Sequence, residues 1–184
     1  MTGCAVNSTL TYDAVMPKDG EAIVVLGVSP SNTKITLHEA IVDNGFVREK
    51  SAFEKGIGGK PLNGYVPLVV KSDTVYKMSN IILYVGDKIG GVYRACDGAR
   101  TLSFKAEPGT VTYIADINFA SIDGKFKTGN RKNFSAARKY IEENYPNLRG
   151  KIVDGKYEMV TPTEKCVDDS ASSSVIVVPY KSKK

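Results

Sequence analysis

The sequence contains few of the residues on which catalysis and metal binding usually depend. It has no Trp, three Cys and a single His, which is His38. Zinc sites take most of their ligands from clustered His and Cys, and this sequence has no such cluster with the spacing of a metal site. We therefore expect no metal site, no cofactor and no enzyme activity.

The alternative is a small hydrolase that uses His38, because a Ser–His or Cys–His site would need this imidazole. His38 lies in a strand predicted over residues 33–42, whose inward side chains are Ile35 and Leu37. Side chains alternate between the two faces of a strand, so we expect His38 to face solvent. That position argues against a catalytic role.

Three further signatures of function are missing. Residues 54–64 are rich in Gly, but Lys60 is not followed by the Ser or Thr of a phosphate-binding loop, so we predict a surface loop. Asp116 has no identifiable acidic partner for a paired-carboxylate glycosidase. The adjacent Asp168 and Asp169 lie in a polar segment and are expected to be solvated rather than to bind Ca²⁺.

No apolar run approaches the roughly 18 residues that a membrane-spanning helix needs.

The chain carries a formal net charge of +5. Its basic residues concentrate in one region, Lys125, Lys127, Arg131, Lys132, Arg138 and Lys139. Together with the lysines near the C-terminus, this region would suit contact with anionic headgroups or lipopolysaccharide, or it is a solvated face. No segment combines basic and aromatic residues as RNA-binding proteins do, so nucleic acid is not expected as a partner. A polyanion or nucleic-acid binder remains an alternative function.

The strongest local pattern is the alternation of apolar and polar residues over 101–119, on both sides of Pro108-Gly109. It predicts a half-buried β-hairpin whose type II turn needs the positive φ that Gly109 tolerates. The inward residues would be Leu102, Phe104, Val111, Tyr113, Ala115 and Ile117. The outward residues of this hairpin include Asp116. Further strands are predicted at 21–28, 33–42, 65–71, 75–85 and 125–128, as a hairpin return after Asn44-Gly45, and as a pair within 150–160.

One helix is predicted over residues 133–145, with Asn133 as its N-cap and Pro146 as its end. Its apolar residues recur at helical spacing on one face, Phe134, Ala137, Tyr140, Ile141 and Tyr145. The predicted fold is therefore all-β, an antiparallel β-sandwich of about seven or eight strands with one C-terminal amphipathic helix.

Composition divides the chain into three parts. Residues 1–18 are predicted to be an N-terminal tether, and residues 19–160 to form the β-sandwich domain with its helix. Residues 161–184 are a polar tail in which 174–180 is an apolar island. Pro179 restricts this island to an edge or an end of a sheet, so an edge strand is expected there.

Two stretches carry a resemblance to known proteins. The start, Met1-Thr2-Gly3-Cys4-Ala5, resembles the end of a bacterial lipoprotein signal, in which the chain is cut before the cysteine that then carries the lipid. The bland alternative is an unstructured tail with a chance cysteine. The segments FKAEPGTVTYIADINF and FSAARKYIEENYPNL resemble a group of small uncharacterised bacterial lipoproteins, with a strand, a Pro-Gly turn, a second strand and a helix closed by Tyr-Pro.

This resemblance implies a transthyretin-like or immunoglobulin-like sandwich, held to the membrane on the periplasmic side by a lipid on Cys4. It implies no enzyme activity, and Ala5 after the cysteine would direct the protein to the outer membrane. If Cys4 is lipidated, Cys96 and Cys166 remain as an even pair in an oxidising compartment, either bridged or both reduced. The expected function is a non-enzymatic, lipid-anchored cell-envelope protein that binds an envelope partner or supports an assembly.

Overall fold

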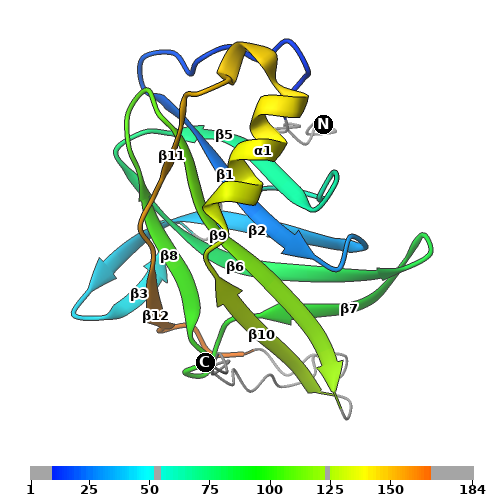
Figure 1. Cartoon of the computed structure of the whole chain (residues 1–184). Coiled ribbons are helices and arrows are strands. Elements are labelled where there is room, and N and C mark those ends of the chain that lie inside the picture. Colours follow the sequence, from blue (N-terminus) through cyan, green and yellow to red (C-terminus); the bar gives the residue numbers. More distant parts are fainter. Residues whose placement is uncertain (1–9, 52–54, 123–124, 167–184) are drawn as a thin grey trace, which may run out of the picture.

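A computed structural model describes residues 10–51, 55–122 and 125–166. These residues form a mostly β structure with one α-helix (Figure 1), which confirms the all-β prediction with a single helix. The strands are β1 Glu21–Ser29, β2 Thr33–Asp43, β3 Phe46–Glu49, β4 Ile57–Gly59, β5 Tyr65–Lys71, β6 Thr74–Val85, β7 Lys88–Arg94, β8 Thr101–Ala106, β9 Val111–Ile122, β10 Lys125–Arg131, β11 Ile152–Asp154 and β12 Glu158–Pro162. Helix α1 spans Phe134–Asn144, and the 3₁₀-helix η1 spans Pro146–Leu148. The described residues contain twelve strands instead of the predicted seven or eight, and β4 and β7 are the strands that the sequence patterns did not indicate.

The strands form two sheets. One has the order β10-β9-β1-β5, with β11 also beside β9. The other has the order β4-β2-β3-β12-β8-β6-β7, and an additional β2–β6 pairing closes part of it on itself. The prediction of a purely antiparallel arrangement is wrong, because β1–β9, β11–β9 and β12–β3 pair in parallel.

The prediction that residues 101–119 form a hairpin is also wrong, because β8 and β9 do not pair with each other. β8 pairs with β6 and β12 in one sheet, whereas β9 pairs with β1, β10 and β11 in the other, so the chain crosses between the sheets at Pro108-Gly109. Gly109 has the expected positive φ of 64°. Its N–H donates to the carbonyl of Glu21 at 3.0 Å, and the N–H of Ile23 donates to the carbonyl of Thr110 at 2.8 Å. These bonds attach the turn to the start of β1, so β9 continues as a parallel neighbour of β1.

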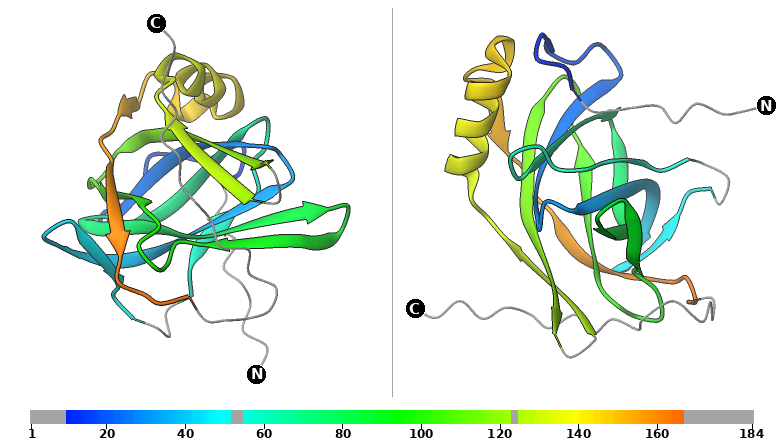
Figure 2. Two further views of the ribbon diagram at one scale, coloured as in Figure 1. Left: turned by 90° about the horizontal axis from the view of Figure 1, so that it is seen from below. Right: turned by 90° about the vertical axis from the view of Figure 1, so that its right-hand side faces the viewer.

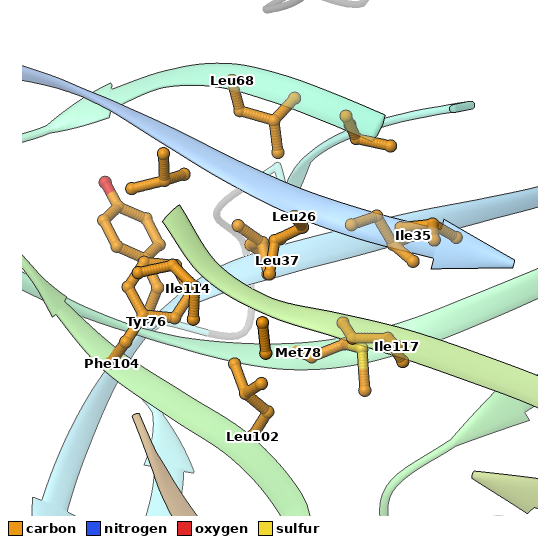
Figure 3. Close-up of a cluster of buried hydrophobic side chains, with 14 of the residues drawn as sticks. Leu26, Ile35, Leu37, Leu68, Tyr76, Met78, Leu102, Phe104, Ile114 and Ile117 are labelled. Atoms are coloured by element: carbon orange, nitrogen blue, oxygen red, sulfur yellow. The ribbon is translucent and has the colours of Figure 1, made fainter. Parts of the chain in front are cut away.

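The main core lies between the two sheets and takes side chains from both (Figure 3). Leu26, Leu68 and Ile117 come from the first sheet and meet Leu37 and Leu102 of the second. All five are almost completely buried. β1 has side chains in the core between the sheets and in the cluster beneath α1, so it is apolar almost throughout rather than alternating.

A register shift in β9 divides its side chains between two clusters. Val25 of β1 pairs with Tyr113 and Leu26 pairs with Ala115, so Ile114 is the extra residue of a β-bulge. Val111 and Tyr113, predicted to face the sandwich core, instead lie under α1, whereas Ile114, Ala115 and Ile117 face the core between the sheets.

Helix α1 covers the outer face of the sheet formed by β1, β5, β9 and β10 (Figure 2). Its buried residues are Ala137, Tyr140 and Ile141, as its helical spacing predicts. The predicted side-chain cap is absent, because Asn133 occupies the N-cap position without a side-chain cap bond. The backbone N–H of Asn133 instead donates to the hydroxyl of Tyr113 at 2.9 Å.

Part of the predicted tether packs on the domain. Leu10 and Ala14 lie against the cluster beneath α1, and Asn147 Nδ2 donates to the carbonyl of Asp13 at 3.3 Å. Residues 1–9, including Cys4, lie outside the described residues. Among the described helices, none has the length and apolar character to cross a membrane.

Three other segments differ from the predictions. Within the Gly-rich stretch 54–64, Ile57–Gly59 forms β4 and pairs with β2, so this stretch is not only a loop. β11 and β12 do not pair with each other, as predicted within 150–160, but join different sheets. β12 continues to Pro162, beyond the predicted domain end at 160, and the predicted edge strand 174–180 lies outside the described residues.

Candidate functional site

A buried lysine marks a polar cluster on the outer face of the second sheet. Lys77 of β6 is 1% exposed. Its Nζ lies 2.6 Å from Glu164 Oε1 and 3.6 Å from Glu49 Oε1. The N–H of Glu49 also donates to Glu164 Oε1 at 2.9 Å. Two carboxylates therefore face one ammonium group, which lowers the cost of burying it.

The ionisation of Glu164 reflects this contact. Burial by itself raises the pKa of this carboxyl, but the hydrogen bonds from Lys77 and from the Glu49 backbone outweigh it. The pKa of Glu164 is therefore lowered from its ordinary value of 4.5, and the carboxylate is ionised at neutral pH.

Glu164 belongs to a short segment that crosses the sheet, residues 163–166, which we call the strap. Its backbone is bonded at three points. The N–H of Thr163 donates to the carbonyl of Val47 at 3.0 Å, and the N–H of Asp97 donates to the carbonyl of Glu164 at 3.0 Å. The N–H of Cys166 donates to Asp97 Oδ2 at 3.2 Å.

The strap ends in a disulfide between Cys96 and Cys166, whose Cα atoms lie 5.2 Å apart. The bond joins residues 70 positions apart in the sequence. The thiol groups of both residues are used in this bond and are not available as metal ligands, although Asp97 lies beside them.

His38 lies beside Lys77 in the β2–β6 register, and its side chain is only 14% exposed. The prediction that it faces solvent is wrong, because the residues around β4 cover this face of β2. A methyl group at Gly56 would come within 2.7 Å of His38 Nε2. Its Nδ1 lies 3.8 Å from Glu49 Oε1 and makes no hydrogen bond in the described structure. The imidazole is therefore enclosed, and among the described residues no serine or cysteine is hydrogen-bonded to its Nδ1 as the pair of a nucleophilic site would be.

A second group of ion pairs is centred on Glu39. Glu39 of β2 is 6% exposed and accepts a hydrogen bond from Lys71 at 2.6 Å and one from Lys50 at 3.0 Å. Lys71 belongs to β5, so this bond joins the two sheets. Burial raises the pKa of Glu39, but the two lysines outweigh it and the net shift is downward.

The predicted basic region is partly neutralised by acidic neighbours. Arg131 Nε lies 3.5 Å from Asp116 Oδ2, and Lys132 Nζ lies 2.6 Å from Asp154 Oδ1. Asp116 is itself buried, so its predicted place on an exposed polar face is wrong. Lys125 is the first residue of β10, and its side chain lies outside the described part of the structure.

The remaining basic residues of this region lie on α1 and β10. Lys139 forms an i,i+4 pair with Glu143 at 3.7 Å, and the guanidinium of Arg138 lies 5.0 Å from the ring centre of Phe134. Lys127 is half-buried. The six residues thus do not form one unpaired basic surface among the described side chains, although several remain accessible to solvent.

An apolar pocket lies between the sheets, at the end where β6 and β7 extend together beyond the other strands (Figure 1). It takes side chains from both sheets and from the turn after β1, and it is lined by Pro30, Thr33, Ile81, Leu83, Gly91, Tyr93, Phe119 and Ala120. Thr33 is fully buried, and its Oγ1 has no hydrogen-bond partner in the described structure. Burial raises the pKa of Tyr93 to about 12, so this wall of the pocket is uncharged at neutral pH.

Comparisons with protein-family models, with curated proteins and with solved structures found no match to this chain. The site is therefore interpreted from its own geometry. Local sequence patterns do not identify the pocket or the polar cluster, because their residues come from strands far apart in the chain: Lys77 and Glu164 are separated by 87 positions. The one usable signal for the polar cluster is a lysine in the middle of an apolar strand.

Proposed function

We propose that the protein is a non-enzymatic, lipid-anchored component of the bacterial cell envelope that binds a partner there. The disulfide between Cys96 and Cys166 is the observation that carries this proposal. Disulfides persist in oxidising compartments such as the periplasm and are rare in the cytosol. Of the three cysteines in the sequence, the bridge leaves only Cys4, at the position that resembles a lipidation site.

The finer description of the fold belongs to the same proposal. Side chains of two facing sheets meet in one core, which supports the description of the domain as a β-sandwich of the transthyretin-like or immunoglobulin-like kind. We place the protein on the periplasmic side of the outer membrane because Ala5 follows Cys4. The accessible members of the basic region would then add contacts with anionic headgroups.

Exposed apolar side chains at hairpin ends support binding of a protein partner. Ile41, Val42 and Phe46 are exposed where β2 turns into β3, and Val85 and Ile89 are exposed at the end of the β6–β7 hairpin. Apolar side chains that cluster on a surface are typical of interaction sites. The enclosure of His38 favours this role over that of a hydrolase.

The proposal is tested with the protein expressed from its natural gene in a bacterium with two membranes. Intact-mass analysis of the membrane fraction should show a diacyl or triacyl adduct on Cys4. A Cys4→Ser variant should lack the adduct and leave the membrane fraction, while a Cys96→Ser/Cys166→Ser variant should keep the adduct. An unmodified Cys4 together with a cytosolic location would contradict the proposal.

A direct test addresses the hydrolase alternative. His38→Gln and wild-type protein are compared against a panel of ester and amide substrates. We expect no turnover that depends on His38; a hydrolysis rate lost in the variant while the protein stays folded would overturn the non-enzyme assignment.

A further inference from the structure

The segment through which the chain enters the domain, residues 10–16, has apolar side chains on both of its sides. Leu10 and Ala14 pack against the cluster beneath α1. Three other apolar residues of this segment are 70%, 62% and 36% exposed, in this order: Tyr12, Val15 and Met16. We call these three residues the entry patch. Single exposed apolar residues are common on protein surfaces, but a group of them is typical of a surface that contacts a partner.

Hydrogen bonds hold the segment that carries the entry patch against the domain. The N–H of Ala14 donates to the carbonyl of Thr11 at 3.0 Å, and Thr11 Oγ1 donates to Asp13 Oδ1 at 2.6 Å. Asn147 Nδ2 donates to the carbonyl of Asp13 at 3.3 Å. Asn147 belongs to η1, so the segment, dark blue in Figure 1, lies beside the end of α1. These contacts keep the entry patch exposed instead of folded back onto the core.

The length of chain between Cys4 and the domain decides what lies opposite the entry patch. Leu10 follows Cys4 by six positions, and six residues span at most about 22 Å when fully extended. A chain of this size folds into a domain roughly 40 Å across. With the lipid proposed for Cys4 in the membrane, Leu10 stays within about half the width of the domain from the bilayer. The entry patch therefore belongs to the membrane side of the domain.

Charge contributes little to this surface. Lys18 and Arg149 are exposed near the entry patch, but the exposed acids Asp13 and Asp19 offset them. Attraction to anionic headgroups is therefore small here. The apolar side chains are the distinguishing feature. Tyr12 suits the boundary between headgroups and acyl chains in particular, because its ring is apolar and its hydroxyl can stay in water.

We propose that the entry patch rests on a phospholipid bilayer, with Tyr12, Val15 and Met16 inserted at the boundary between the headgroups and the acyl chains. The inference rests on the proposed lipid at Cys4, and it adds the surface by which the domain meets the membrane. Three apolar side chains bind a bilayer weakly by themselves, so the patch orients a protein that is already anchored. The β2–β3 and β6–β7 hairpins lie away from this segment (Figures 1 and 2) and stay available to the envelope partner.

The experiment supplies the anchor chemically. Since Cys96 and Cys166 are bridged, the full chain is coupled through Cys4 to a maleimide-headgroup lipid in phosphatidylcholine vesicles. The sequence contains no Trp, so Tyr12→Trp places a single fluorescent reporter in the entry patch. We expect its emission to shift to shorter wavelength on anchoring. Lipids brominated in the upper part of the acyl chains should quench it, because interfacial side chains reach about 5–10 Å into this boundary.

Two further variants locate the contact. Ile89→Trp is the matched control, because Ile89 is 61% exposed at the end of the β6–β7 hairpin, and its emission should not change on anchoring. Val15→Ser/Met16→Ser, added to Tyr12→Trp, removes two of the three apolar side chains and should reduce the quenching by at least about threefold. Both positions are exposed, so urea unfolding should match that of Tyr12→Trp alone, and loss of the fold cannot mimic the reduced quenching.

Four results would overturn the inference. The first is equal quenching, or none, of the reporters at positions 12 and 89. The second is quenching that appears only when anionic lipid is added. The third is unchanged quenching in the Val15→Ser/Met16→Ser protein. The fourth is a reporter at position 12 that is shielded from aqueous iodide but not quenched by brominated lipid, because a second copy or a partner protein would then cover the patch. None of these outcomes depends on whether a cell attaches a lipid to Cys4, which the intact-mass analysis decides separately.

Discussion

Neutralising Glu164 should destabilise the protein far more than neutralising a surface acid. The side chain of Lys77 is 2% exposed, so its charge is compensated by neighbouring groups rather than by water. Removing one partner of a buried ion pair costs about 3–5 kcal/mol. Glu49 remains 3.6 Å from Lys77 in a Glu164→Gln variant and compensates part of the charge. We therefore expect Glu164→Gln to lower the free energy of unfolding by about 2–3 kcal/mol, and the further change Glu49→Gln to bring the loss to about 3–5 kcal/mol.

Removing the buried charge should rescue the loss. Lys77→Met replaces the ammonium by an apolar group of similar length, and a well-packed apolar replacement of a buried ion pair is often neutral or stabilising. The double variant Lys77→Met/Glu164→Gln should therefore be more stable than Glu164→Gln alone. We expect the two changes to deviate from additivity by at least about 1 kcal/mol.

The same contact predicts the response of stability to acid. The pKa of Glu164 is lower in the folded protein than its ordinary value of 4.5. The unfolded chain therefore binds a proton first as the pH falls, so the contribution of Glu164 is present above pH 4.5 and is lost below it. The Glu164→Gln variant lacks this contribution at all pH values, and its stability should fall less steeply below pH 4.5 than that of the wild type.

Urea unfolding at pH 7, followed by circular dichroism, measures these differences. Glu158→Gln is the matched control, because Glu158 is an exposed carboxyl on β12; its change should stay within about 0.5 kcal/mol. The reasoning is refuted if Glu164→Gln is as mild as Glu158→Gln, or if the effects of Lys77→Met and Glu164→Gln are additive. Either result would mean that Lys77 reaches water in the folded protein.

Three further outcomes are expected. Reduction of the Cys96–Cys166 disulfide, which spans 70 positions, should lower the free energy of unfolding by about 4 kcal/mol, measured by urea unfolding with and without reductant. Gly27→Ala should cost about 1–3 kcal/mol in the same assay, because its methyl group would overlap the carboxylate of Asp116. The pKa of Tyr93 is raised by burial to about 12, so stability should decline as the pH rises from 10 towards 12, and tyrosinate absorbance should show Tyr93 ionising near the upper limit.

Local patterns predicted the elements that local chemistry determines. The apolar run at β1, the turn at Asn44-Gly45 and the buried face of α1 follow from side-chain periodicity and from residues that accept a positive φ. Asn44 and Gly45 have φ values of 49° and 81°, as the predicted turn requires. Each of these features depends on residues close together in sequence, which is why the sequence alone identifies them.

Pairing between strands could not be predicted in the same way. Apolar side chains that alternate on either side of Pro108-Gly109 suit a hairpin within one sheet and equally suit a crossing between two sheets. The structure takes the second course because β1 is apolar on both faces and offers β9 a parallel edge. The bulge at Ile114 then changes which side chains of β9 face the core. The spacing of apolar residues in the sequence does not reveal such a bulge.

The polar cluster shows why an apparently featureless tail matters to the fold. The composition after residue 160 suggests that the domain has ended, yet Glu164 provides the closest carboxylate to the buried Lys77. Two residues further on, Cys166 is bonded to Cys96, and Asp97 is hydrogen-bonded to the strap at Glu164 and at Cys166. The disulfide therefore restrains the position of a carboxylate that the core needs. Because reduction would free this end of the strap, we expect it to weaken the Lys77–Glu164 contact as well as to raise the conformational entropy of the unfolded chain. The free energy of unfolding lost by the reduced Glu164→Gln protein should therefore be smaller than the sum of the losses from reduction alone and from Glu164→Gln alone.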